Sequence, residues 1–145
     1  MEKFVDVILP LPLHACFTYS LPEDMAGSVQ IGCRVVVPFG RKKYYTAIVQ
    51  NIHYSAPAGY EVKEVSALLD AHPILLPEQF RFWDWLADYY LCTRGDVYKA
   101  ALPSGLKLES ETIVEYNPDF ESDVQLPEKE QKILDLLAAE PEQCI

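Results

Sequence analysis

The feature that most constrains this chain is a change in the spacing of its apolar residues at Pro77. Before that residue they fall in short runs rich in β-branched and aromatic side chains, with turn residues between the runs. After it they recur at helical spacing. At 145 residues the chain is long enough for one ordinary domain and part of another. The sequence therefore predicts an α+β fold in which a sheet comes first and helices follow.

The sheet is predicted from five β-prone runs in the first seventy residues. These runs cover 4–9, 17–21, 33–39, 44–54 and 63–69. No helical pattern lies between them, so successive strands are expected to follow one another through turns and loops. About five short strands at this spacing favour a small antiparallel sheet that curls into a barrel-like shape.

Two helices are predicted to follow the sheet and to pack on it. The first begins at Pro77, a residue favoured in a first turn, and aromatic side chains cover most of its circumference. We therefore expect this helix to be packed on two sides, with its aromatic rings in the core. Gly95 suits the left-handed position after its last turn. The second helix is predicted over 96–101.

Acidic residues are concentrated in the last quarter of the chain, and this uneven charge divides it into parts. Residues 1–108 hold 10 Lys and Arg against 11 Asp and Glu, whereas residues 109–145 hold 2 against 11 and carry most of the net charge of −10. The first part is predicted to be one domain, and 109–126 to be an acidic linker with one β-prone run. An amphipathic helix then opens 127–145, and one such helix cannot bury its own apolar face. We expect this last part to be the truncated start of a second domain in a longer chain.

The residues give no support to several classes of function. The sequence contains no Gly-rich phosphate loop, no H-E-x-x-H and no G-x-S-x-G motif, so no enzyme activity is expected of this chain by itself. Its four cysteines are scattered without a C-x-x-C pair, which predicts neither a metal site nor a cofactor. No apolar run approaches the ~18 residues of a membrane span, and no signal peptide is recognisable, so a cytoplasmic protein without membrane contact is expected.

A His14-x-Cys16 pair leaves one catalytic alternative open. Residues two apart in an extended segment share a face, so the imidazole and the thiol can meet. A hydrolase with Cys16 as its nucleophile also needs an orienting partner and an oxyanion site, and the sequence suggests neither. We rank this alternative below the binding functions.

The polar feature that stands out is the run VPFGRKKYY. Gly40 suits a turn at which a ligand can approach the backbone closely. The basic residues that follow it, next to two tyrosines, are Arg41, Lys42 and Lys43. Single-stranded nucleic acid binding uses such residues, because cations meet phosphates and rings stack on bases. A solubilising loop tip with a turn glycine fits the same pattern, and the pattern alone leaves both interpretations open.

Four separated segments resemble a known family. They read VILPLPLHACFTYSLPE, GCRVVVPFGRKKYYTAIV, VKEVSALLD and LADYYLCTRGDVYKAALP. In order and spacing they resemble the N-terminal DNA-binding domain of the PriA family, the bacterial replication-restart helicases also called primosomal protein N′. The resemblance covers residues 3 to about 108. The later segment LPEKEQKILDLLA looks like the start of that family's winged-helix domain.

The resemblance implies a site. In the family, a pocket of the barrel-like domain receives the 3′-terminal nucleotide of the nascent leading strand at a stalled fork, whatever its base. In the matching positions Phe17 would pack on the base or sugar, Gly40 would offer its backbone, and Lys63 would donate from its ammonium. Thr18 stands where the family has an acidic residue, so a weaker hydrogen bond to the 3′-hydroxyl is expected. The basic run after Gly40 would add salt-dependent contacts to the DNA backbone.

For a longer protein, the resemblance implies an ATP-dependent 3′-to-5′ DNA helicase that uses ATP and zinc. Primosome proteins and single-stranded-DNA-binding protein would be its partners. The domain itself would bind the 3′ end of a single strand or forked DNA, and would orient the helicase during primosome assembly and replication restart. The alternative is a protein-interaction barrel without nucleic-acid binding, which predicts an exposed aromatic patch on the helix that begins at Pro77.

Overall fold

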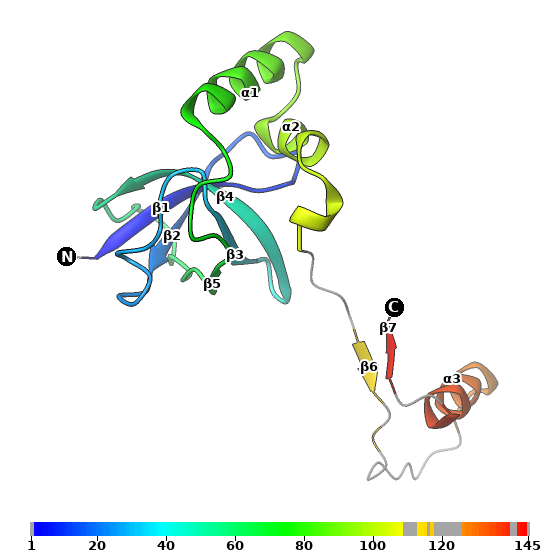
Figure 1. Ribbon diagram of the computed structural model, residues 1–145. Helices are drawn as coiled ribbons and strands as arrows, with labels where there is room; N and C mark the ends of the chain where they lie inside the picture. The colour runs from blue at the N-terminus through cyan, green and yellow to red at the C-terminus, as the bar shows by residue number, and fades with distance from the viewer. Residues whose placement is uncertain (1, 109–112, 116, 118–125, 140–141, 145) are drawn as a thin grey trace. The chain divides into compact units, whose positions relative to one another are not determined.

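The computed structural model describes residues 2–108, 113–115, 117, 126–139 and 142–144 (Figure 1). The chain divides into two compact units, Met1–Glu109 and Ser110–Ile145. The strands of the first unit are β1 (Lys3–Ile8), β2 (Phe17–Leu21), β3 (Arg34–Phe39), β4 (Lys43–His53) and β5 (Ala67–Leu68). Its helices are α1 (Pro77–Tyr90), α2 (Arg94–Ala101) and the short 3₁₀ helix η1 (Ser104–Leu106).

The expected five-stranded antiparallel sheet is confirmed. Its strand order is β2-β1-β4-β3-β5, and every neighbouring pair is antiparallel. The segment that leads into β5 also meets β2, at the opposite edge of the sheet. There the Ser20 N–H donates to Lys63 O at 3.0 Å, and the Val65 N–H donates to Ser20 O at 3.0 Å. These two hydrogen bonds form one isolated parallel bridge between the two edges of an otherwise open, curled sheet, whose ribbon is drawn in Figure 1.

Side chains that alternate along the strands fill the inside of the curled sheet. The buried members are Val5, Val7, Leu9, Tyr19, Leu21, Val29, Val35, Val37, Ala47, Val49 and Val65. β-Branched side chains dominate this set because they pack well on a pleated surface. Complete burial of each large apolar side chain contributes about 1.5–3 kcal/mol, so this cluster is the main source of stability for the sheet.

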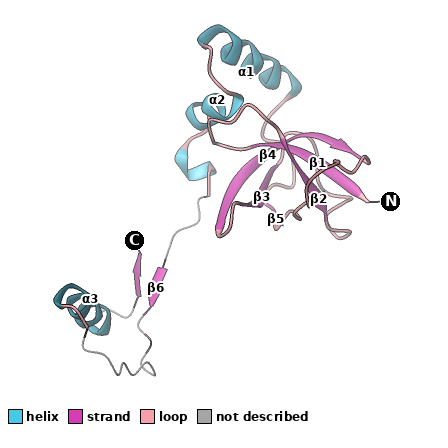
Figure 2. Ribbon diagram, turned by 180° about the vertical axis from the view of Figure 1, so that it is seen from behind, coloured by secondary structure: helices cyan, strands magenta, loops and turns pink. Residues whose placement is uncertain are grey.

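The two helices cover the sheet through a second apolar cluster. Trp83 of α1 and Tyr98 of α2 stack with their ring centroids 5.9 Å apart, and Tyr98 is fully buried. The Tyr98 hydroxyl donates to Thr46 O of β4 at 2.8 Å, so the buried phenol is paired. Ile8 and Ile48 supply the sheet's part of this cluster. Both helices lie on the same side of the sheet (Figure 2).

The packing expected for α1 is only partly right. Trp83 and Ala87 are buried, but Phe82, Trp85 and Tyr89 are 56%, 54% and 65% exposed. These three rings stack in a row, with centroids 6.0 Å apart for Phe82 and Trp85 and 5.1 Å apart for Trp85 and Tyr89. The expectation that they form core was wrong. Helical spacing shows that a helix has an apolar face, but it does not show whether the domain itself covers that face.

The end of α1 also differs from the prediction. Leu91, and not Gly95, takes the left-handed conformation after the helix, with φ 52° and ψ 41°. Gly95 lies inside α2, which begins after an N-cap at Thr93. There α2 approaches the chain beyond β1 so closely that a Cβ on Gly95 would lie 1.8 Å from Leu11 O. The glycine is required by this close approach rather than by a turn.

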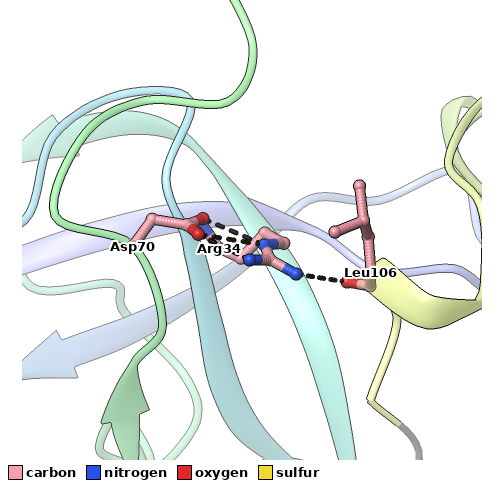
Figure 3. Close-up of polar contacts among 3 residues, drawn as sticks. All are labelled: Arg34, Asp70 and Leu106. Carbon is pink, nitrogen blue, oxygen red and sulfur yellow. Dashed lines mark hydrogen bonds and ion pairs between the residues drawn. The ribbon is translucent and has the colours of Figure 1, made fainter.

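Arg34 ties both the segment after β5 and the end of the domain to β3 (Figure 3). Arg34 of β3 and Asp70 are bonded at 2.6 Å, with 14% and 8% of their side chains exposed. Arg34 Nη1 also donates to Leu106 O at 2.8 Å. The Thr46 hydroxyl donates to Leu108 O at 2.8 Å. The hydrogen bond from Arg34 lowers the pKa of Asp70 from its ordinary value of 3.8, and this effect exceeds the opposing effect of burial.

The second unit contains β6 (Ile113–Glu115), α3 (Glu128–Ala139) and β7 (Glu142–Cys144). β6 and β7 form an antiparallel pair. The strand predicted within 109–126 and the helix predicted at the start of 127–145 are therefore confirmed, whereas most of the predicted linker lies outside the described residues. The domain boundaries themselves stay predictions. In the part of the chain that the structure describes, no helix is both long and apolar enough to cross a bilayer.

The close approach at α2 predicts that Gly95→Ala destabilises the domain. The new Cβ would collide with backbone carbonyls at 1.8 and 2.6 Å, so the backbone must shift. We expect a loss of about 2 kcal/mol or more in the free energy of unfolding, measured by denaturant titration. Gly105→Ala is the control, because nothing lies within 4 Å of its added Cβ. Equal stability of the two variants would contradict the interpretation.

The Arg34–Asp70 pair predicts a specific loss of stability in acid. Because the folded-state pKa of Asp70 is lowered, its contribution is complete above about pH 5 and is lost as pH falls through and below its ordinary value of 3.8. Asp70→Asn should cost about 2–3 kcal/mol at neutral pH and progressively less below about pH 4, in thermal unfolding followed by circular dichroism. Asp84→Asn, which breaks the more exposed Asp84–Arg94 pair, should cost less than about 1 kcal/mol.

Candidate nucleic-acid interface

A small pocket lies where β2, the β3–β4 turn and the chain before β5 meet. Its volume is about 170 Å³. The residues that line it are Phe17, Thr18, Tyr19, Pro38, Phe39, Gly40, Tyr60, Glu61 and Lys63. The structure thus brings together all four residues that the resemblance assigned to the 3′ end, namely Phe17, Thr18, Gly40 and Lys63.

Aromatic rings form the apolar wall of this pocket. Phe17 opens β2, where its side chain shares the inward face with Tyr19, and it is packed against the barrel core without being fully buried. Its ring meets that of Phe39 edge to face, with centroids 5.1 Å apart. Phe39 in turn meets Tyr45 edge to face at 6.1 Å. Two half-buried rings therefore keep part of their surface available to an aromatic or sugar ligand.

The β3–β4 turn forms the polar side of the pocket. Gly40 has a φ of +70°, the left-handed region that glycine adopts without strain, and nothing lies within 4 Å of where its Cβ would be. Lys63 Nζ donates to Gly40 O at 2.6 Å, and the Tyr19 hydroxyl donates to Pro38 O at 3.1 Å. Burial raises the pKa of Tyr19 to about 12, so this donor stays protonated. The turn is thus held by contacts from two separate segments.

Thr18 lines the pocket, but its hydroxyl is already bonded. Successive side chains of a strand point to opposite faces, so that of Thr18 lies opposite the inward-facing Phe17 and Tyr19. The Thr18 hydroxyl donates to Asp6 Oδ1 at 2.7 Å, and Asp6 also contacts His53. Partial burial would raise the pKa of Asp6, but these hydrogen bonds outweigh burial and lower it. The role predicted for Thr18 stays a prediction: its hydroxyl hydrogen is donated to Asp6, and its oxygen can still accept a hydrogen bond.

The basic run stands beside the pocket rather than in it. Arg41, Lys42 and Lys43 are exposed, and none of them lines the cavity. They follow Gly40 directly, so their charges lie at the edge of the pocket. Tyr44, which follows them, is 46% exposed. Cations next to an exposed ring beside a small aromatic pocket are suited to a strand of nucleic acid that continues away from the pocket.

A larger cavity of about 580 Å³ lies between the β1–β2 connection and the helices, and it contains His14 and Cys16. The Cys16 thiol donates to Gln50 Oε1 at 3.1 Å, and burial raises its pKa, so the reactive thiolate is disfavoured. Asp84 and Asp88 also line this cavity, and Asp84 is ion-paired with Arg94, so the described lining has no cation that lacks a carboxylate partner to favour a phosphate. Within the described residues no group of three or more His, Cys, Asp or Glu side chains could hold a metal ion.

Some pocket residues were missed from the sequence. Phe39 belongs to the strand before Gly40, and its position two residues after the inward-facing Val37 could have indicated a place in the wall. Tyr60 and Glu61 lie in the long connection between β4 and β5, where no periodic pattern indicates a direction. Only the meeting of this connection with β2 reveals that they line the pocket.

A curled antiparallel sheet with an aromatic pocket, an ammonium and a basic turn is typical of domains that bind single-stranded nucleic acid. Residues 6–103 match the family model described as the 3′DNA-binding domain (3′BD) of PriA, and residues 111–145 match a winged helix domain. The chain belongs to the PriA 3′DNA-binding domain family.

Curated relatives agree with this assignment. The replication restart protein PriA of Bacillus subtilis is 33% identical over 137 residues, which cover 91% of this chain and 17% of the relative. The protein of the same name from Haemophilus influenzae is 38% identical over 108 residues, covering 72% of this chain and 14% of the relative. A third, from Treponema pallidum, is 29% identical over 108 residues, covering 72% and 16%. The chain thus spans less than a fifth of these relatives.

Proposed function

We propose that this domain binds the 3′-terminal nucleotide of a DNA strand in the pocket between Phe17, Gly40 and Lys63. The observation that carries the proposal is that these residues, far apart in the sequence, line one cavity in a chain of the 3′DNA-binding domain family. The rings of Phe17 and Phe39 would contact the base or sugar. Every base has an apolar face, so this contact does not depend on sequence.

The size of the pocket supports recognition of an end. Clefts that enclose a drug-sized ligand occupy roughly 300–1,000 Å³, and this pocket is smaller, at about 170 Å³. A cavity of that size would hold the sugar or base of one nucleotide and would leave little room for a second one beside it. Internal nucleotides would therefore be excluded because their 3′ phosphate and the next sugar find no room.

Cations would supply affinity without sequence preference. Lys63 would contact the terminal nucleotide, and Arg41, Lys42 and Lys43 would meet phosphates of the strand outside the pocket. The first 108 residues carry 10 basic against 11 acidic residues, so the local cluster and not the net charge determines the potential near the pocket. Binding of this kind consumes no ATP and requires no metal ion.

In a cell, the domain would act on the 3′ end of the nascent leading strand at a stalled replication fork. Forks stall at any sequence, so recognition independent of the base suits this task. By anchoring the 3′ end, the domain would orient an attached ATP-dependent 3′-to-5′ helicase during primosome assembly, with primosome proteins and single-stranded-DNA-binding protein as partners of the full protein. These events would take place in the cytoplasm.

A protein contact is a second candidate function, and one observation favours it. The stacked row of Phe82, Trp85 and Tyr89 on α1 is more than half exposed. Exposed aromatic rows of this kind mark surfaces that contact other proteins or other domains. None of these three residues lines the pocket at Phe17, so the two functions can coexist in one domain.

End recognition predicts that a linear single strand with a 3′-hydroxyl binds more tightly than a circular strand of the same sequence. We expect about a tenfold difference, the equivalent of one stacked nucleotide, by competition in fluorescence anisotropy. Linear strands that differ only in their terminal base should bind within about threefold of one another. Equal affinity for linear and circular strands would rule out the proposal.

Lys63→Met tests the cationic contact at the pocket. The loss of the ammonium should weaken binding of linear strands about three- to tenfold and reduce the difference between linear and circular strands. Lys107→Met is a matched control, because Lys107 also donates to a backbone carbonyl, that of Lys99, but lines neither cavity. If both variants bind with the affinity of the wild type, Lys63 does not contact the nucleotide.

A further inference from the structure

We propose that Glu61 is the residue that distinguishes a 3′-hydroxyl from a 3′-phosphate. This inference rests on the proposed binding of a 3′-terminal nucleotide in the pocket. It concerns the 3′-hydroxyl, the group that an internal nucleotide lacks. A hydroxyl is neutral and donates a hydrogen bond, whereas a phosphate monoester carries about −1.5 to −2 charges at neutral pH and presents mainly acceptor oxygens. The pocket therefore needs a charged acceptor where the hydroxyl lies.

Three neutral oxygens at the pocket already take part in hydrogen bonds, and a neutral acceptor binds a hydroxyl about half as strongly as a carboxylate does. The Thr18 hydroxyl contacts Asp6, the Pro38 carbonyl accepts from Tyr19, and the Gly40 carbonyl accepts from Lys63. Among the described residues, Glu61 is the only carboxylate in the lining. No hydrogen bond or ion pair of its side chain occurs within the described part of the chain.

The path of the backbone explains why Glu61 and Lys63 lie at the same pocket. The Ser20 N–H donates to Lys63 O and the Ser20 carbonyl accepts from the Val65 N–H, so the chain is extended here, and Val65 packs in the barrel core. In an extended segment, alternate residues share a face, so Lys63 and Glu61 lie on the side of Val65. The lining agrees, because it includes Glu61 and Lys63 but not Glu64.

A carboxylate and an ammonium in this arrangement would fix the orientation of the bound nucleotide, with its 5′ phosphate and its 3′-hydroxyl at different ends of the pocket. Lys63 attracts the phosphate on the 5′ side of the terminal sugar, as any cation near a strand does. Glu61 accepts a charge-assisted hydrogen bond from a 3′-hydroxyl and repels negative charge at the 3′ position. The same repulsion acts on the phosphodiester of an internal nucleotide, so Glu61 adds an electrostatic exclusion to the steric one.

The test compares 5′-labelled short strands that end in a 3′-hydroxyl, a 3′-phosphate, a 3′-amine or a 3′-deoxy sugar. For the wild type we expect the hydroxyl end to bind about tenfold more tightly than the phosphate end and about fivefold more tightly than the deoxy end. The amine end keeps a donor and should bind at least as well as the hydroxyl. In Glu61→Gln the preference over phosphate should fall to about twofold or less.

Glu64→Gln is the matched control. It removes the same charge from the same segment, is exposed, and does not line the pocket. Both variants should raise the affinity for any strand slightly, but only Glu61→Gln should change the ratio between ends. Thermal unfolding midpoints equal to that of the wild type will show that both variants are folded.

Two results are decisive and can be told apart. If the wild type prefers linear to circular strands but Glu61→Gln keeps the full preference for hydroxyl over phosphate, the assignment of Glu61 is overturned and the proposed function stands. If the wild type does not distinguish linear from circular strands, the proposed function fails and this inference fails with it.

Discussion

The pocket depends on the pair of backbone hydrogen bonds by which Ser20 holds Lys63 and Val65 at 3.0 Å each. Without them, β2 would be an open edge and the chain before β5 would have no fixed position relative to it. With them, Phe17 from one edge and Lys63 from the other line one cavity. The bonds involve main-chain atoms only, so the closure does not depend on the side chains that the pocket displays. Pocket residues can therefore vary while the frame stays the same.

The domain separates its two exposed features. The pocket lies where the sheet edges meet, and its rings are half-buried and supported by the barrel core. The aromatic row of α1 belongs to a helix that is held by a different apolar cluster, centred on Trp83 and Tyr98. Because the two clusters are distinct, a ligand at one feature need not disturb the packing that supports the other. A ligand in the pocket and a contact at the aromatic row would therefore be structurally independent of each other.

Much of the fold could be predicted from spacing alone, because strands and helices impose periods of two and 3.6 on a chain that must bury one face. β2 was predicted with its observed limits, Phe17–Leu21. Tertiary context accounts for the errors. Gly95 was read as a turn residue because its sequence does not reveal the backbone of Leu11 against it. Resemblance to the family indicated Phe17 as a site residue from the sequence alone. Glu61 lies in a connection without a periodic pattern, so only the three-dimensional structure shows that it lines the pocket.

The attachment of Leu106 and Leu108 to the sheet has a mechanical consequence. Arg34 of β3 and Thr46 of β4 hold their carbonyl oxygens, both at 2.8 Å, just before the chain leaves the domain. A pull on the outgoing chain is therefore received by β3 and β4, which lie inside the strand order, and not by β2 at its edge. Force on the outgoing chain is thus transmitted to β3 and β4, the two strands joined by the turn at Gly40 that lines the pocket.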